Sequence, residues 1–387
     1  MKKMLSSNKT ILRSGPVVCA VNHEYQIMVP VNCETLMRVT VNGREYYCHS
    51  NGVRRSDCPV QRFIVPMEEL DAAKEYTLHY QKVITRMAYS CIKGRMISKT
   101  YSFRPIAASD INVYVLSDCH GLGKEAAQAG SFYGQSLDLL ILNGDVSSSC
   151  MTIEEAMLPY DIAFEITKGA VPCVITRGNH DLRGKYSERL HELMPTDHGK
   201  TYYQIFFGTL WLLVLDCGED KMDNHREYGG TAAFHTMRIE ESEFLEALTC
   251  HPDAEFRSGS VCRRIIVSHI PIMYRDRGTS RGEQPFDIEN SIYQQWIDRI
   301  NTAIKPDLYI AGHLHRNAIW QVDAPENSRH IDCPVLITGV PDHGRQKNCS
   351  GAALCLHNNQ IDVAFTDSKH FVSGKKQMRS SGGAYTL

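Results

Sequence analysis

The sequence predicts an α/β domain preceded by a small all-β sandwich, and two observations lead to this fold class. From about residue 15 to 105 the chain consists of short β-branched and aromatic runs divided by turn residues, whereas from about residue 110 apolar runs alternate with helical patterns. In addition, a chain of 387 residues is longer than the chains that usually fold around a single hydrophobic core. We therefore expect an N-terminal β-sandwich domain over residues 1–108 and a second domain over residues 109–387.

The N-terminal region has the alternating pattern of antiparallel strands. The strand-like runs are "EYQIMVPV" (24–31), "LMRVTVNGREYY" (36–47), "EYTLHYQKVI" (75–84) and "KTYSFRP" (99–105). Turn signals such as "VNGRE" (41–45) and "HSNGV" (49–53) divide them. Short strands with this spacing are typical of sandwiches of the immunoglobulin or fibronectin III kind, and "RPIAASDIN" (104–112) is the expected linker.

The second region alternates apolar strands with helices. The expected strands are "NVYVLS" (112–117), "LDLLILN" (137–143), "VPCVITR" (171–177), "LWLLVLD" (210–216), "RRIIVSH" (263–269) and "DLYIAG" (307–312). The expected helices are 153–167, 241–249 and 291–304. In the last helix, Ile292, Trp296 and Ile300 share one face, and we interpret this stripe as core packing.

Composition indicates a globular protein without a general affinity for polyanions. Hydrophobic residues make up 43% and charged residues 22%, and the formal net charge is −2. Neither nucleic acid nor an anionic membrane is therefore favoured as a partner attracted by net charge. The basic N-terminus has no apolar segment behind it, no run has the length of a transmembrane helix, and the fourteen cysteines are scattered singly. Such cysteines suit reduced thiols, so we expect a cytoplasmic location.

Polar clusters follow nearly every predicted strand of the second region. They read "SDCHG", "NGDV", "RGNHD", "LDCGED", "VSHIP" and "AGHLHR". In open α/β sheets, sites form beyond the carboxyl ends of the strands. Any one of these clusters alone would be an ordinary turn or surface loop, but their repetition at successive strand ends indicates one shared site.

The clusters supply a mixed set of nitrogen and oxygen donors. The predicted metal ligands are Asp118, His120, Asp145, Asn179, His269, His313 and His315. This set suits divalent manganese, iron, zinc or cobalt better than calcium or a thiolate zinc site. Seven donors are too many for one tetrahedral ion and fit two ions with a bridging carboxylate, about 3.5–4 Å apart as in two-metal hydrolytic sites.

The ordered motifs D-x-H, G-D, G-N-H-D, H and G-H-x-H resemble those of the calcineurin-like metallophosphoesterase superfamily, over about residues 110–345. The resemblance implies a two-sheet αββα sandwich flanked by helices, with a dinuclear centre at the strand ends. It assigns Asp118, His120 and His315 to the first ion, Asn179, His269 and His313 to the second, and Asp145 to both. It places His180 outside the ligand shell, as general acid or as stabiliser of the leaving oxygen.

The expected activity is hydrolysis of a small-molecule phosphomonoester or phosphodiester by attack of a hydroxide that bridges the two ions. The catalytic candidates are His180, Asp145 and Arg183, and the substrate-binding candidates are Asn179, His180 and Arg183. For Arg183 we weigh a phosphate contact equally against a salt bridge to Asp181 or Glu219. We expect Asp181 to orient a neighbouring histidine. The polar loop 217–230 is long enough to overhang the site and shape substrate access, but an ordinary solvated loop is the default interpretation.

The β-sandwich resembles the arrangement in purple acid phosphatases and related bacterial proteins, but the metal motifs differ from that subgroup. Purple acid phosphatases carry a metal-bound tyrosine where this chain has Ser148, and an aspartate where it has His120. A ferric–tyrosinate centre is therefore not expected. Two alternative functions stay open, a nuclease and an interaction scaffold with weak chemistry. The first would need a basic, aromatic groove, and the second would be expected to have lost ligands.

Overall fold

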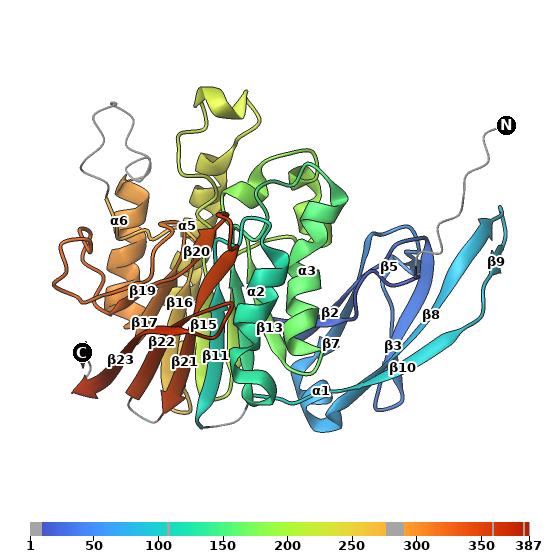
Figure 1. Cartoon of the computed structure of the whole chain (residues 1–387), viewed down its shortest axis with the longest axis horizontal. Coiled ribbons are helices and arrows are strands. Elements are labelled where there is room, and N and C mark those ends of the chain that lie inside the picture. The colour runs from blue at the N-terminus through green and yellow to red at the C-terminus, as the bar shows by residue number, and fades with distance from the viewer. Residues whose placement is uncertain (1–9, 107–108, 276–289, 358–359, 382–383, 387) are drawn as a thin grey trace.

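The computed structural model describes residues 10–106, 109–275, 290–357, 360–381 and 384–386. Two β-sheets face each other in the C-terminal part, helices cover their outer faces, and an all-β region precedes them (Figure 1). This is the predicted fold class, an αββα sandwich with an N-terminal β-region. No helix in the described ranges is both long and apolar enough to cross a bilayer.

The first of the two facing sheets contains the predicted strands after the linker and a C-terminal set that the sequence analysis did not identify. Its strands are β11 (Ile111–Leu116), β12 (Leu139–Asn143), β13 (Pro172–Thr176), β20 (Val340–Asp342), β21 (Asn348–His357), β22 (Gln360–Asp367), β23 (Val372–Ser381) and β24 (Ala384–Thr386). β11, β12 and β13 pair in parallel, and β21 pairs antiparallel with β11. The parallel order brings the carboxyl ends of three strands to one edge.

The second facing sheet has four parallel neighbours at its centre. Its strands are β14 (Tyr203–Phe207), β15 (Leu210–Val214), β16 (Arg263–Val267), β17 (Leu308–Ala311), β19 (Val335–Ile337) and β18 (Ala318–Trp320). β15, β16, β17 and β19 run parallel to one another. Strands β15, β16 and β17 are those predicted from the sequence, within two residues at each end.

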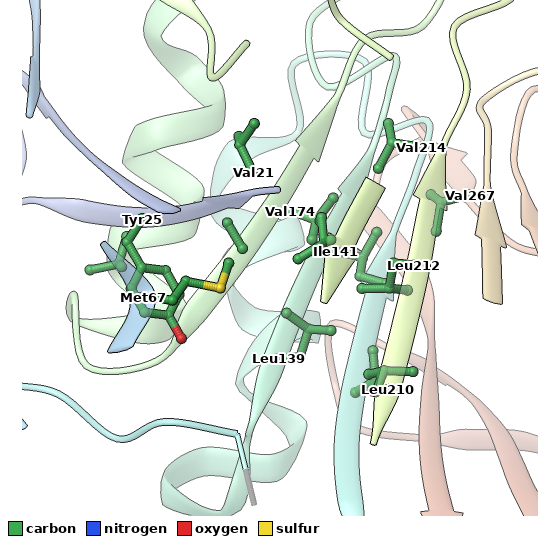
Figure 2. Close-up of a cluster of buried hydrophobic side chains, with 14 of the residues drawn as sticks. Val21, Tyr25, Met67, Leu139, Ile141, Val174, Leu210, Leu212, Val214 and Val267 are labelled. Carbon is green, nitrogen blue, oxygen red and sulfur yellow. The ribbon is translucent and has the colours of Figure 1, made fainter. Parts of the chain in front are cut away.

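Aliphatic side chains fill the space between the two sheets. Figure 2 shows Leu139, Ile141 and Val174 of the first sheet opposite Leu210, Leu212, Val214 and Val267 of the second. Residues at alternate positions of a strand point to the same face, and in these strands that face is turned toward the opposite sheet. All of these side chains are therefore buried. This core holds the two sets of strand ends in a fixed relation to each other.

Helices cover the two outer faces. α2 (Gly123–Gly130) and α3 (Ile153–Thr167) pack on the first sheet, and α5 (Phe234–Cys250) and α6 (Asn290–Arg299) pack on the second (Figure 1). α3 has the predicted bounds and begins with a capping box between Thr152 and Glu155. The stripe of Ile292, Trp296 and Ile300 is buried against the second sheet, which confirms its interpretation as core.

The N-terminal region packs two sheets face to face, as predicted. One contains β10 (Ile97–Ser102), β8 (Glu75–Arg86), β3 (Thr35–Val41) and β4 (Arg44–Tyr46), with β9 (Cys91–Lys93) paired to β8. The other contains β1 (Val17–Val21), β2 (Glu24–Pro30) and β7 (Val60–Pro66). Further elements are β5 (His49–Ser50), β6 (Val53–Arg54) and α1 (Met67–Ala73).

The N-terminal region is joined to the α/β part through its strands. β1 pairs in parallel with β13, at Val18 opposite Pro172 and Cys19 opposite Cys173, so that β1, β2 and β7 extend the first facing sheet. Residue 108 of the predicted domain boundary lies outside the described residues, and the division at that point stays a prediction. All fourteen cysteines are free thiols.

Candidate metal centre

The strand ends of both facing sheets deliver the predicted ligands to one place. Asp118 follows β11, Asp145 follows β12, and Asn179 follows β13. From the second sheet, His269 follows β16, and His313 and His315 follow β17. Three groups of side chains could hold a metal ion. Two of them, Asp118 with His120 and His315 and Asp145 with His269 and His313, combine residues of both sheets, whereas the third, His120 with Asp145 and His180, comes from the first sheet alone.

Asp118, His120 and His315 form the first group. The Nε2 atoms of His120 and His315 are 2.9 Å apart, and Asp118 Oδ1 lies 3.4 Å from His315 Nε2 and 3.9 Å from His120 Nε2. Ligand atoms bound at about 2.0–2.2 Å to one ion are about 3–4 Å from each other. The three atoms therefore fit a single ion.

Asp145, His269 and His313 form the second group, and Asn179 adjoins it. Asp145 Oδ2 lies 3.3 Å from His269 Nε2. Asn179 Oδ1 lies 2.9 Å from His313 Nδ1. This group has the one carboxylate, one amide oxygen and two imidazoles that the family resemblance assigns to a second ion.

One oxygen of Asp145 lies between the two groups. Asp145 Oδ2 is 3.7 Å from His120 Nε2 in the first group and 3.3 Å from His269 Nε2 in the second. The other oxygen, Oδ1, accepts a hydrogen bond from the backbone amide of His180 at 2.8 Å. The carboxylate is thus held by one oxygen and presents the other to both groups, as a bridging ligand requires.

Two buried polar atoms in this cluster make no hydrogen bond with any described residue. They are Asp118 Oδ1 and His269 Nε2. The other oxygen of Asp118 and the other ring nitrogen of His269 both have hydrogen-bond partners. Asp118 Oδ2 accepts from Ser117 Oγ and from the amide of His313, while His269 Nδ1 lies 2.8 Å from the Asn143 carbonyl oxygen. Buried polar atoms are normally paired, so two unpaired atoms facing the same space fit a cation.

The backbone around the ligands is constrained. Five of the seven predicted ligands have left-handed backbone conformations, with φ between 43° and 69°. These five are Asp118, His120, Asp145, His313 and His315. Such conformations cost energy in residues with a Cβ and are concentrated at functional sites.

Glycines allow the loops to approach one another. A Cβ at Gly312 would lie 1.8 Å from Ser117 Oγ, and a Cβ at Gly178 would lie 2.3 Å from Asp145 Oδ1. A Cβ at Gly144 would lie 2.6 Å from His269 Nδ1. The glycine before each of the motifs N-H-D, D and H-x-H is therefore required for the ligands to meet.

The charges of the cluster call for a cation. Burial opposes the charging of His269, but the carboxylates of Asp145 and Asp118 outweigh it and raise the pKa of this imidazole to about 10. Burial lowers the pKa of His120 and of His313 to about 4. Two buried carboxylates thus draw positive charge to the site. The proton of His269 supplies that charge in the absence of metal, and a cation would replace this proton, because histidine binds metal as the neutral imidazole.

Asp181 does not orient a histidine, contrary to the expectation from sequence. Its carboxylate accepts hydrogen bonds from the backbone amides of Asp145 at 2.8 Å, Gly178 at 2.9 Å and Ser147 at 3.4 Å. Asp181 therefore joins the loop after β12 to the loop after β13. No pattern in the sequence distinguishes this role, because the groups that it binds are main-chain amides.

Arg183 makes the salt bridge to Glu219 that was one of its two predicted roles. Nε lies 2.8 Å from Glu219 Oε1 and Nη2 lies 3.0 Å from Oε2, while Nη1 lies 3.2 Å from His180 Nε2. Glu219 is 2% exposed and also accepts from the hydroxyl of Tyr228 at 3.1 Å. The guanidinium therefore fixes the loop 217–230 beside His180 and turns Nη1 toward that imidazole.

The loop 217–230 reaches the ligands, which favours the overhanging role over that of an ordinary solvated loop. Asp220 Oδ2 lies 3.8 Å from His313 Nε2, and Lys221 Nζ lies 3.1 Å from Asp220 Oδ1. His180 Nδ1 lies 3.1 Å from the carbonyl oxygen of Ser148, and its ring stands perpendicular to that of His120 with centroids 4.7 Å apart. His180 thus lies beside His120 and Asp145, with which it forms the third group able to hold an ion, while the other two groups are complete without it.

Sequence reasoning missed the residues that hold the ligands in place. Ser117 donates to Asp118, and the Asn143 carbonyl oxygen lies against His269. Gly312 and Gly339 leave room for Asp118, since a Cβ at either would lie within 2.7 Å of Asp118 Oδ2, and Asp220 approaches His313. A Ser before the D-x-H aspartate and a Gly in G-H-x-H were visible in the sequence, but residue type alone does not show which atoms they touch.

Comparison with known proteins identifies the same kind of fold. A family model described as calcineurin-like phosphoesterase matches residues 111–317. Purple acid phosphatase PPD1 from yellow lupin (Lupinus luteus) seeds aligns with a TM-score of 0.57 and 12% identity, over 95% of this chain and 75% of that chain. PhoD aligns with a TM-score of 0.54 and 10% identity, over 96% and 91% of the two chains. No curated protein matches the sequence. At these identities the two solved structures show a shared fold alone.

Proposed function

The chain belongs to the calcineurin-like phosphoesterase family, and from that premise we propose that it hydrolyses phosphoesters with two divalent metal ions held at the strand ends. The observation that carries this proposal is the pair of buried, unpaired atoms Asp118 Oδ1 and His269 Nε2, which face the same space as Asp145 Oδ2. An oxygen and a nitrogen without hydrogen-bond partners, beside a carboxylate, are what a metal ion satisfies.

The ligands divide between the ions as the distances group them. Asp118, His120 and His315 would hold one ion, Asn179, His269 and His313 the other, and Asp145 both. When bound, the ions supply an activated water as nucleophile and offset the charge of the phosphate oxygens. We propose manganese, iron or zinc, because a set of imidazoles and carboxylates accepts each of them.

His180 is proposed to assist the departure of the leaving group. Its Nδ1 faces the Ser148 carbonyl oxygen at 3.1 Å, an acceptor, so Nδ1 carries a hydrogen, and Nε2 of the neutral ring accepts a hydrogen bond from Arg183 Nη1 at 3.2 Å. If Arg183 turned to a bound phosphate, Nε2 would be open to the leaving oxygen. In the protonated imidazolium, Nε2 can give its proton to the leaving alkoxide oxygen. Arg183 Nη1, 3.2 Å from that nitrogen, is proposed as a contact for a phosphate oxygen.

The proposed substrate is a small-molecule phosphomonoester or phosphodiester. A cytoplasmic location is also proposed and is supported by the fourteen free cysteines.

The test uses manganese-loaded protein with p-nitrophenyl phosphate and with its bis ester. We expect hydrolysis of at least one of them and a loss of at least about a thousandfold in Asp145→Ala, since bridging and charge stabilisation are removed together. Asp253→Ala changes an exposed aspartate outside the cluster and should hydrolyse at the wild-type rate. A wild-type rate in Asp145→Ala would refute the proposed site.

The role of His180 has a separate test. Nitrophenolate leaves without a proton, whereas an alkoxide needs one. His180→Gln should therefore slow hydrolysis of an alkyl phosphate far more than hydrolysis of p-nitrophenyl phosphate. Equal slowing of both substrates would exclude proton donation.

A further inference from the structure

A β-hairpin arm extends beyond the rest of the N-terminal sandwich. The arm consists of residues 82–97, which include the end of β8, all of β9 and the start of β10 (Figure 1). β8 and β9 pair antiparallel, and a hydrogen bond of 2.8 Å from the amide of Met87 to the carbonyl oxygen of Ser90 closes the turn at the tip. The arm is thus an ordered hairpin with little of the sandwich around it.

Exposed hydrophobic side chains are concentrated on this arm. Of thirteen large hydrophobic residues exposed in the described part of the chain, six lie on the arm. They are Ile84, Met87, Tyr89, Ile92, Met96 and Ile97, and Tyr89 at the tip is 102% exposed. Scattered exposed hydrophobic residues are ordinary, but a contiguous group of this kind marks a surface that contacts another molecule.

The same segment is strongly basic. Between Glu75 and Asp110 the sequence has six basic residues and no Asp or Glu: Lys82, Arg86, Lys93, Arg95, Lys99 and Arg104. Arg86 pairs with Glu34 at 3.0 Å, and Arg104 pairs with Asp138 at 3.7 Å. Lys82, Lys93 and Arg95 lie on the arm with exposed side chains. A net charge of −2 for the whole chain therefore hides a local positive surface.

From this combination we infer that the arm docks the protein onto the surface of a bilayer that contains anionic phospholipid. Lys82, Lys93 and Arg95 would contact the headgroups, since anionic lipids attract basic residues near the surface. Met87 and Tyr89 at the tip would enter the boundary between headgroups and acyl chains, where apolar and aromatic side chains are stable. Charge complementarity selects an anionic partner, and the aliphatic side chains select lipid.

Nucleic acid is also anionic but fits this surface less well. Binding to single strands uses aromatic rings on which bases stack, and Tyr89 is the one exposed aromatic residue of the arm. Ile84, Ile92 and Ile97 offer no stacking surface.

The inference is tested by sedimentation of the full chain with vesicles of phosphatidylcholine alone and of phosphatidylcholine with about one third phosphatidylserine. We expect binding to the anionic vesicles and release by added salt. Each basic residue contributes about a fivefold change in partitioning, so the combined variant Lys82→Gln, Lys93→Gln and Arg95→Gln should bind about a hundredfold more weakly. The pair Met87→Ser and Tyr89→Ser should lose at least about tenfold, because apolar burial at the boundary is removed.

Matched controls separate the arm from general surface effects. Lys305→Gln, Lys347→Gln and Lys375→Gln remove the same charge from exposed positions elsewhere, and Ile239→Ser with Phe371→Ser removes exposed hydrophobic residues outside the arm. All variants should keep wild-type phosphoester hydrolysis, which also shows that they are folded. If hydrolysis itself is absent in the wild type, vesicle binding still tests the arm independently.

Three results of the binding assays would overturn the inference, and a fourth comes from sedimentation without lipid. The binding results are equal binding of arm and control variants to anionic vesicles, no binding of the wild type to those vesicles, and arm-dependent binding to a single-stranded oligonucleotide in place of the vesicles. Arm-dependent formation of a dimer, measured by sedimentation velocity without lipid, would likewise assign the surface to a second copy of the chain.

Discussion

Replacing Gly312 by alanine should displace the ligand Asp118 without touching any ligand chemically. A Cβ at this position would lie 1.8 Å from Ser117 Oγ and 2.7 Å from Asp118 Oδ2. Gly312 has no left-handed backbone angle, so alanine meets no conformational penalty there and the effect is steric. Ser117 is fully buried and cannot move into solvent.

The cost follows from what Ser117 would have to give up. Its hydroxyl donates toward Asp118 Oδ2 at 2.7 Å and the Asn143 carbonyl oxygen at 2.9 Å, two acceptors that hold its position. Loss of one hydrogen bond to a charged group costs about 1.5–3 kcal/mol, and overpacking of a dense interior costs about 1–3 kcal/mol more. We therefore expect the free energy of unfolding to fall by about 2.5–6 kcal/mol. Manganese affinity should fall about 10–100-fold, as when a group that orients a ligand is changed.

Urea unfolding and titration calorimetry with manganese measure the two effects. Gly259→Ala is the matched control, since Gly259 also lacks a left-handed angle but has no atom within 4 Å of the position that a Cβ would take. Adding Ser117→Gly to Gly312→Ala removes two of the three nearest contacts, Ser117 Oγ at 1.8 Å and Ser117 Cβ at 2.8 Å, and should restore part of the stability. Wild-type stability and manganese affinity in Gly312→Ala would show that the loops do not meet as described.

Three further predictions concern the surroundings of the site and one thiol of the N-terminal region. Arg183→Ala and Glu219→Gln should each lower kcat/KM for phosphoester hydrolysis, and the double variant should lose little more than either single one, because the residues act as one pair; additive losses would contradict that pairing. Chelation with EDTA should lower the melting temperature and abolish hydrolysis, and manganese should restore both, since about 2.7 kcal/mol of stabilisation accompanies binding at a hundred times the dissociation constant; a melting temperature insensitive to chelator would contradict a built metal site. The pKa of the Cys48 thiol lies below its ordinary value, mainly through a hydrogen bond from Cys58 and against the effect of burial, whereas burial raises the pKa of the Cys150 thiol, so at pH 7 mass spectrometry should find Cys48 alkylated faster than Cys150, which is also buried; equal rates at pH 7 would contradict it.

The parts of the fold that were predictable from sequence are those with a local pattern. The strand before each polar cluster and the helix 153–167 appear where the apolar periodicity places them. The parallel pairing of β1 with β13 was not predictable. Cys19 and Cys173 lie opposite each other in these strands but far apart in the sequence, and neither strand has a pattern that indicates its neighbour. The C-terminal strands β21–β24 were missed although their residues alternate, because no motif drew attention to them.

At the site, the ligand types and their order could be predicted, and their supports could not. Histidines and aspartates that follow several successive strands have few common roles other than binding a metal ion together, so the motifs predicted the ligands. Asp181 lies in the same motif but binds main-chain amides, which every residue except proline has, and its role depended on how the loops approach. The choice between two roles for Arg183 likewise depended on where the loop carrying Glu219 lies.

The central claim is that the strand ends hold two metal ions through one shared carboxylate. Metal analysis of manganese-loaded protein after removal of free metal tests it most directly, in the wild type and in Asp145→Ala. The account predicts two ions per chain in the wild type and fewer than one in Asp145→Ala, with hydrolysis lost in parallel. A single ion per chain in fully active wild-type protein, or two ions retained in Asp145→Ala, would contradict it.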